Sequence, residues 1–143
     1  QGVSSFSRNL IDFNGISLTF PSNWEVTEKE TINNRKDYFI IKTDYQPYTV
    51  FVGLNVEINP PYKSSFIYEP ARFMVGDIKI VDNGCGGAVR CDVVVVDGDV
   101  YLLDWIIEKS TQPVPTNLDG IWQPDNNITG EKLDSILKTI KKI

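Results

Sequence analysis

Apolar and polar residues alternate along several segments of this chain, and the alternation limits its fold more than any other feature of the sequence. In a half-buried strand successive side chains point to opposite faces, so such a segment forms a strand with one face in a core. The longest example is 49–58, in which every second residue from Val50 to Ile58 is aliphatic. The strands predicted for one antiparallel sheet are 16–20, 38–43, 49–58, 89–96 and 99–108, with a further strand at 77–83.

Turn residues separate these segments. Asp97-Gly98, one of the strongest two-residue hairpin signals, lies between the last two strands. Proline at position 21 ends the first strand and Trp24 resumes the alternation, so we expect an opening hairpin with the indole in the core. Residues 28–37 are expected to form a polar loop, and 66–75 to hold a short helix.

The end of the chain changes to the helical period. Leu133, Ile136, Leu137 and Ile140 follow the spacing i, i+3, i+4, i+7 of an amphipathic helix, which we predict over 129–142. Lysines are expected in its last turn, where cations complement the helix carbonyls. Strands that mostly follow one another, closed by such a helix, predict the α+β class: an antiparallel β-sheet flanked by helices.

A length of 143 residues corresponds to a single domain, which we assign to residues 13–143. Residues 1–12 are expected to be a tether or the remnant of a leader, joining the domain to a cleaved signal or a lipid anchor. They lack the apolar region of a signal peptide. No run of apolar residues approaches the ~20 needed to cross a bilayer, so we expect no membrane span.

The net charge of −5 argues against a nucleic-acid partner. Nucleic-acid binding depends on Lys and Arg side chains that neutralise phosphates. The one basic cluster of the sequence is Lys138, Lys141 and Lys142, in the predicted terminal helix. These lysines are explained by the helix dipole, and we expect no nucleic acid to bind.

The residues needed for common catalytic and metal sites are missing. The chain has no histidine, which removes Ser-His-Asp and Cys-His pairs and the commonest metal ligand. Ser135 and Lys138 match a serine–lysine motif, but without its companion elements. Asp97, Asp99 and Asp125 lie in turn sequences without the ligand series of a calcium loop. We therefore predict a protein that is not an enzyme and has no cofactor and no metal.

Cys85 and Cys91 are the only cysteines, and five residues, two of them glycine, separate them. A redox pair favours Cys-x-x-Cys at the start of a helix, which this spacing does not match. Two interpretations stay open: a structural disulfide at the mouth of a hairpin, and two buried free thiols. We favour the disulfide, because neighbouring strands can bring two Cα atoms within about 4.4–6.8 Å. A disulfide in turn favours an oxidising compartment.

Two loops, 59–70 and 110–127, carry aromatic residues near acidic ones. Such residues resemble the anchors of protein interfaces. The opposing interpretation is that the indole of Trp122 lies beneath the terminal helix and that Tyr62 and Tyr68 cover edges of the core. The predicted partner-binding residues are Asp119, Ile121, Trp122, Asp125, Tyr62, Phe66 and Tyr68.

Two motifs resemble the PsbP-like family. GISLTFPSNWEV, residues 15–26, is similar to the opening hairpin of that family, and LDSILKTIKKI, residues 133–143, is similar to its terminal helix. The family includes photosystem II subunits, DcrB-type lipoproteins, a Ran-binding import factor and some secretion-system immunity proteins. The resemblance implies a non-enzymatic binding or assembly module, often outside the cytoplasm.

From these observations we expect an exported protein, periplasmic or extracellular, that recognises a protein partner through its loops. The alternative is a periplasmic immunity protein that neutralises a secreted bacterial toxin. Small size, acidity and the acidic aromatic loops fit the alternative, with a basic surface or a toxin as the partner.

Overall fold

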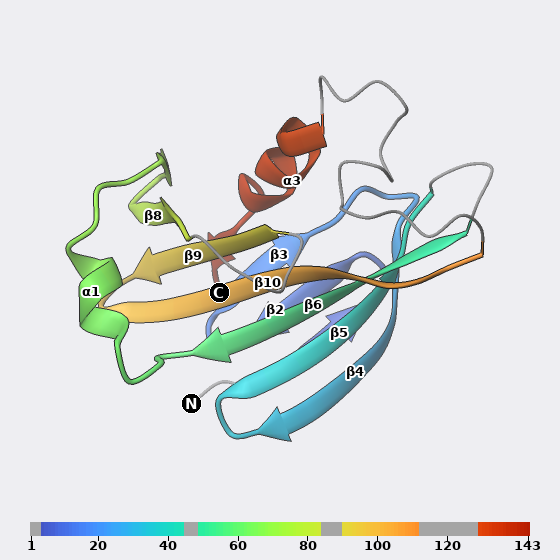
Figure 1. Cartoon of the computed structure of the whole chain (residues 1–143), viewed down its shortest axis with the longest axis horizontal. Helices are drawn as coiled ribbons and strands as arrows, with labels where there is room; N and C mark the ends of the chain where they lie inside the picture. The colour runs from blue at the N-terminus through green and yellow to red at the C-terminus, as the bar shows by residue number, and fades with distance from the viewer. Residues whose placement is uncertain (1–3, 45–48, 84–89, 112–128) are drawn as a thin grey trace.

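The computed structural model of the chain describes residues 4–44, 49–83, 90–111 and 129–143, and these form two antiparallel sheets and two short helices (Figure 1). The larger sheet has seven strands in the order β4-β5-β6-β10-β9-β8-β7. Its strands are β4 (Glu25–Asn33), β5 (Lys36–Lys42), β6 (Val50–Ile58), β7 (Phe73–Val75), β8 (Ile78–Asp82), β9 (Arg90–Val96) and β10 (Asp99–Ser110). The long strands β6 and β10 lie next to each other at its centre.

The smaller sheet has four strands in the order β1-β2-β3-β11. Three of these strands come from the start of the chain and the fourth from its end, so the two termini meet in one sheet. Its strands are β1 (Ser5–Ser7), β2 (Leu10–Phe13), β3 (Ile16–Thr19) and β11 (Lys141–Lys142).

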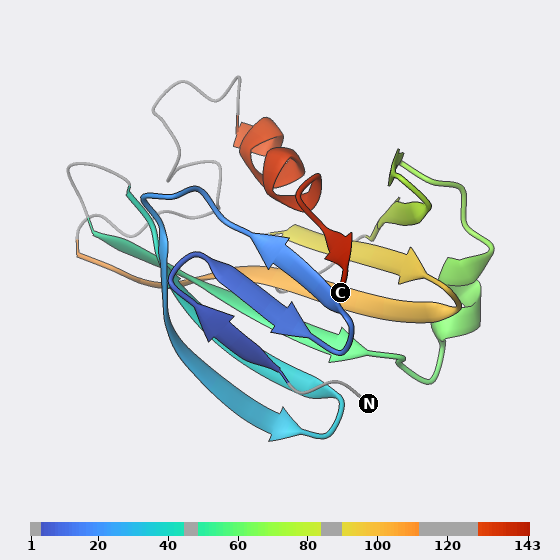
Figure 2. The same cartoon turned by 180° about the vertical axis from the view of Figure 1, so that it is seen from behind.

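The smaller sheet and the helix α3 (Thr129–Leu137) lie side by side against one face of the seven-stranded sheet (Figures 1 and 2). We call this the inner face. The helix α1 (Lys63–Ile67) lies at the opposite, outer face, beside the ends of β9 and β10. The alternation of the strands explains this arrangement, because it gives the large sheet one continuous apolar face.

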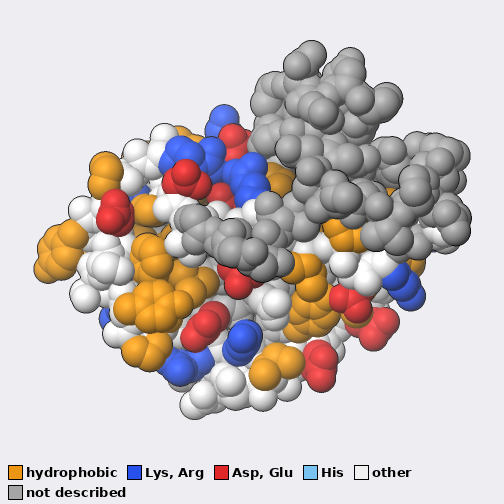
Figure 3. Space-filling model, viewed as in Figure 1, with side chains coloured by type: hydrophobic (Ala, Val, Ile, Leu, Met, Phe, Trp, Pro, Cys, Tyr) orange, Lys and Arg blue, Asp and Glu red, His pale blue; other side chains and the backbone are white. Residues whose placement is uncertain are grey.

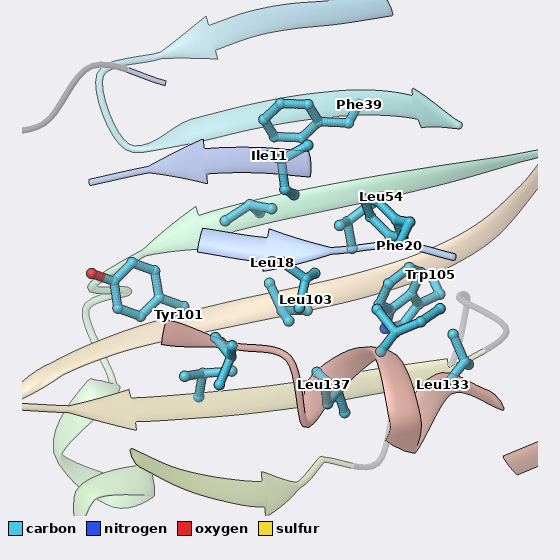
Figure 4. Packing of buried hydrophobic residues seen from close by; sticks show 14 of the residues in the cluster. Ile11, Leu18, Phe20, Phe39, Leu54, Tyr101, Leu103, Trp105, Leu133 and Leu137 are labelled. Carbon is cyan, nitrogen blue, oxygen red and sulfur yellow. The ribbon is translucent and has the colours of Figure 1, made fainter. Parts of the chain in front are cut away.

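The main core lies between the inner face and its two covering elements (Figure 4). Trp24 and Trp105 are almost fully buried there, and the ring of Phe20 contacts both, at centroid distances of 6.1 and 6.3 Å. Leu133 and Leu137 of α3 belong to the same buried cluster. The helical spacing in the sequence therefore corresponds to side chains that lie in the core.

Most of the predicted strands are present. The predicted segments at 38–43, 49–58, 77–83, 89–96 and 99–108 correspond to β5, β6, β8, β9 and β10. The hairpin at Asp97-Gly98 is confirmed, since Val96 pairs with Asp99 and both turn residues have positive φ. The protein is mostly antiparallel sheet with short helices, in agreement with the coarse α+β class.

The predicted opening hairpin is wrong, although Trp24 is in the core as expected. β3 pairs with β2 and β11 in the small sheet, whereas β4 pairs with β5 in the large one. The break at Pro21 thus separates two sheets rather than two paired strands.

The polar loop predicted at 28–37 is also wrong, because β4 continues to Asn33 and β5 begins at Lys36. β4 is an edge strand whose side chains from Thr27 onward are mostly exposed, so it shows little apolar alternation. Charged side chains are common on such edges, where they discourage pairing with another chain.

The two predicted helices have different boundaries from those expected. Residues 66–75 do not form a helix: α1 ends at Ile67, and Phe73–Val75 is strand β7. The terminal helix ends at Leu137 instead of 142, and Lys141–Lys142 forms β11. The expected lysines are therefore absent from its last turn.

Residues 5–12, expected to be part of a tether, form β1 and most of β2. Ile11 is fully buried in the main core. Lys29 on β4 donates a hydrogen bond to the carbonyl of Ser4 at 3.2 Å, which attaches the start of the described chain to the large sheet. This segment therefore belongs to the folded domain.

Candidate protein-interaction surface

The outer face of the large sheet carries a second, smaller hydrophobic cluster. It consists of five aliphatic side chains from β8, β9 and β10: Val81, Val93, Val95, Val100 and Leu102. Phe66 and Ile67 of α1 pack against this cluster and are themselves only partly buried. No residue of α1 is fully buried, so this helix of five residues is a thin cover.

Two exposed tyrosines flank α1. The side chain of Tyr62 is 56 % exposed and that of Tyr68 is 86 % exposed. The rings of Tyr62 and Phe66 lie 5.8 Å apart in a tilted arrangement, so the two aromatics form one contiguous surface.

Lys79 on β8 attaches the C-terminal end of α1 to the sheet. Its ammonium group donates to the carbonyls of Ile67 and Glu69, both at 2.6 Å. Met74 is the direct cross-strand neighbour of Lys79 on β7, and it is 52 % exposed. We define the α1 surface as Tyr62, Phe66, Tyr68 and Met74. In Figure 3 hydrophobic side chains gather on the part of the molecule where α1 lies in Figure 1.

At the opposite side of the sheet, a group of charged residues links α3 to the inner face. The carboxylate of Asp92 on β9 is fully buried and accepts hydrogen bonds from Arg90, from Arg72 and from the indole nitrogen of Trp105, at 3.1–3.3 Å. Both arginines also bond to Asp134 of α3, Arg72 through two nitrogens at 2.9 and 3.2 Å. We call these four charged residues the Asp92 network.

The pKa values of the two carboxylates of the Asp92 network are shifted in opposite directions. Burial raises the pKa of Asp92, and the two guanidiniums and the Trp105 N–H act against that rise. Burial also acts to raise the pKa of Asp134, but there the hydrogen bonds and charges of Arg72 and Arg90 outweigh it and the pKa falls below its ordinary value. Through its bonds to Asp134, the Asp92 network attaches α3 to β9 and to Arg72.

Farther along the outer face, a tyrosine lies flat across a glycine. A Cβ atom added at Gly53 on β6 would be 2.0 Å from the phenol oxygen of Tyr38 on β5, so only glycine fits beneath the ring. The phenol donates a hydrogen bond to Glu108 on β10, which spans three strands. Burial, followed by the hydrogen bond and charge of Glu108, raises the pKa of Tyr38.

The predicted partner-binding residues have different outcomes. Asp119, Ile121, Trp122 and Asp125 lie outside the described residues, so their roles stay predictions. Tyr62, Phe66 and Tyr68 are described and lie together on the α1 surface, where both tyrosines are exposed. Met74 was missed, because a single methionine next to a turn carries no signal until strand pairing places it opposite Lys79.

Cys91 is buried on β9 and is disulfide-bonded. Cys85 lies outside the described residues, so the pairing of these two cysteines stays a prediction.

No three His, Cys, Asp or Glu side chains of the described residues are grouped as metal ligands would be. Neither helix in the described ranges has the length and hydropathy of a bilayer-spanning segment. No family model, curated protein or solved structure matches the chain.

Proposed function

We propose that this protein is a non-enzymatic binding module that recognises a protein partner through the α1 surface, together with the 110–127 loop. The observation that carries the proposal is the exposure of Tyr62 and Tyr68 beside α1. Tyrosine is enriched at the energetic centres of protein interfaces, because it contributes a large rigid area and a hydroxyl group.

The support for the α1 surface also comes from what lies beneath it. α1 covers a separate hydrophobic cluster, and Lys79 holds its end through two short hydrogen bonds. An aromatic group held on a sheet in this way is ordered before a partner arrives, so binding costs less conformational entropy.

We propose further that the fold is PsbP-like, with α3 closing the sheet, and that the protein is exported to the periplasm or to the outside of the cell. The burial of Leu133, Ile136 and Leu137 in the main core supports a closing role for α3. The disulfide at Cys91 supports an oxidising compartment, where such bonds persist. A lipid anchor would be compatible with the same location.

A site-specific crosslinking experiment in the host organism tests the binding proposal. A photoreactive phenylalanine analogue replaces Tyr68 in one variant and Ile32 in the control. Ile32 is a matched control because it is 49 % exposed and lies on β4, at the other edge of the large sheet. We expect a discrete crosslinked partner at position 68 and none at position 32.

Titration of the identified partner then measures the contribution of each side chain. Tyr68→Ala and Tyr62→Ala should each weaken binding by about 2 kcal/mol, as truncated interface anchors do, with unchanged melting temperature. Ile32→Ala should leave affinity unchanged. Wild-type affinity in both tyrosine variants would move the binding surface elsewhere. A crosslinked partner that is a secreted toxin would favour the immunity function over an assembly role.

A further inference from the structure

Three hairpin turns meet at one end of the molecule, on the right in Figure 2. They are the turn at Asn14-Gly15 between β2 and β3, the turn at Asn34-Arg35 between β4 and β5, and the turn at Asp97-Gly98 between β9 and β10. The end of β6 and the last residues of the chain complete this end. Both sheets therefore contribute to it.

Two adjoining cavities open between these turns. One has a volume of about 220 Å³ and is lined by Asp97, Asp99 and Tyr101 among others. The second has a volume of about 290 Å³ and is lined by Arg35 and Asn59, and Asn14 lines both cavities. These volumes lie near or below the lower limit of typical ligand pockets, so only a small molecule fits.

Opposite charges lie in the two cavities. The guanidinium of Arg35 makes one side-chain hydrogen bond to a described residue, from Nη1 to the carbonyl of Asn59 at 2.9 Å. Asp99 accepts one bond, from the side-chain amide of Asn59 to Oδ1 at 3.0 Å. The neighbouring Asp97 is paired with Lys142, whereas no described cation lies within 4.0 Å of the carboxylate of Asp99. Lys63 is nearby: its ammonium group donates to Oδ1 of Asn59 at 3.5 Å and to the carbonyl of Gly98 at 3.4 Å.

Asn59 limits how far apart the two charges can lie. This single residue presents an acceptor, its carbonyl oxygen, to Arg35 and a donor, its amide nitrogen, to Asp99. The path through Asn59, one amino-acid residue and two hydrogen bonds, therefore sets an upper limit on the distance between the guanidinium and the carboxylate. Asn59 is itself held by two hydrogen bonds with the backbone of Val100, its N–H donating at 2.7 Å and its Oδ1 accepting at 2.9 Å.

We propose that this end of the protein binds a small zwitterion of the α-amino acid class, with the ligand carboxylate on Arg35 and the ligand ammonium group on Asp99. Arginine suits the first role because its planar fork of donors matches a carboxylate. Ile16 lines the first cavity and Ile58 lines the second, so the small side chain of such a ligand would lie beside an apolar residue. This site includes none of the four residues of the α1 surface and does not depend on a protein partner, although Lys63 at the start of α1 donates hydrogen bonds to Asn59 and to the carbonyl of Gly98 beside it.

The test is an NMR titration of the full ¹⁵N-labelled chain with glycine, L-alanine, L-serine and L-glutamine. We expect at least one of them to shift the side-chain amide signals of Asn14 and Asn59, with a dissociation constant of about 1 mM or tighter, which so small a ligand can reach. The N-acetyl and carboxamide forms of the best ligand, each lacking one charge, should bind at least about tenfold more weakly.

Four variants locate the site. Arg35→Gln and Asp99→Asn should each weaken binding at least about tenfold, since each removes one charged hydrogen bond. Lys42→Gln, at the far end of β5, and Asp104→Asn, on the outer face of β10, remove the same charges elsewhere and should leave affinity unchanged. Unchanged spectral dispersion shows that each variant is folded. No shift with any of the four amino acids up to about 10 mM, or wild-type affinity in Arg35→Gln and Asp99→Asn, would overturn the proposal.

Discussion

Replacing Asp92 by asparagine should destabilise the protein by about 3 kcal/mol. The change keeps the size and shape of a fully buried side chain and removes its charge. In the native protein both carboxylate oxygens accept bonds, from two arginines and from the indole of Trp105. An asparagine offers one acceptor oxygen, so its amide nitrogen must face other donors.

The magnitude follows from the surroundings of this carboxylate. Removing one partner of a buried ion pair costs about 3–5 kcal/mol, because the opposite charge stays buried without compensation. The side chains of Arg72 and Arg90 are 30 and 20 % exposed, and both still contact Asp134. Water and Asp134 therefore compensate them in part, which places the cost at the lower end of that range.

Urea unfolding measures this loss directly. For a domain of this size, about 3 kcal/mol corresponds to a decrease of about 1–2 M in the midpoint and about 10 °C in the melting temperature. Asp104→Asn is the matched control: it is the same substitution on the neighbouring strand β10, on the half-exposed outer face, where it should change stability by less than about 0.5 kcal/mol.

Two results would refute the reasoning. A loss below about 1 kcal/mol for Asp92→Asn would mean that the buried charge contributes little beyond its shape. Equal losses of stability for Asp92→Asn and Asp104→Asn would mean that any negative charge on this part of the sheet stabilises the protein. The burial of the Asp92 carboxylate and its bonds to two arginines would then not be the cause.

Three further predictions concern other parts of the fold. Gly53→Ala should cost about 1–2 kcal/mol in the wild type and about 1 kcal/mol less in a Tyr38→Ala background, because the closest clash is with the tyrosine while a contact with Ile106 Cγ1 at 2.9 Å remains. Urea unfolding of the double-mutant cycle measures the coupling, and equal costs in the two backgrounds would contradict it. The pKa of Asp134 is lower in the folded protein than in the unfolded chain, so its stabilising contribution is fully present above about pH 4 and declines as the pH falls further. Asp134→Asn should therefore lower the free energy of unfolding by about 1 kcal/mol at neutral pH and by less in acid. A constant loss from pH 7 to pH 2 would argue against the ion pairs. Mass spectrometry of unreduced protein from an oxidising compartment, after alkylation, should find Cys85 and Cys91 unmodified, whereas alkylation of both would count against the disulfide.

The sequence by itself was sufficient for elements whose signal is local. β6 alternates along most of its length because one side of the strand is in the main core, and β10 is a nearly continuous apolar run because its two sides lie in the two hydrophobic clusters. Both patterns are visible without any partner strand. The Asp97-Gly98 turn was equally predictable, because few residue pairs accept two successive positive φ angles. The exposed tyrosines beside α1 could be proposed as binding residues because aromatic side chains in a polar loop are conspicuous.

The edge strand and the last turn of the chain depended on neighbours that the sequence does not reveal. β4 lacks alternation because most of it is exposed at the rim of the sheet, so its charged residues resemble a loop. Lys141 and Lys142 continue a helical pattern, but pairing with Ser17 and Ile16 of β3 supplies backbone hydrogen bonds that favour a strand there. Local propensity is a weak term, and tertiary pairing overrides it.

The sites themselves were decided only by the tertiary structure. Arg72 is 20 residues from Asp92 and 62 from Asp134 in the sequence, and each residue alone resembles an ordinary surface charge. They become a buried network because β9 and α3 come together over Trp105. The same holds for Arg35 and Asp99, which are joined through Asn59. The periodicity of apolar residues indicates which side of a single strand or helix is buried. A charge network depends instead on distances between strands and helices, and these are set only when the two sheets and the helix pack.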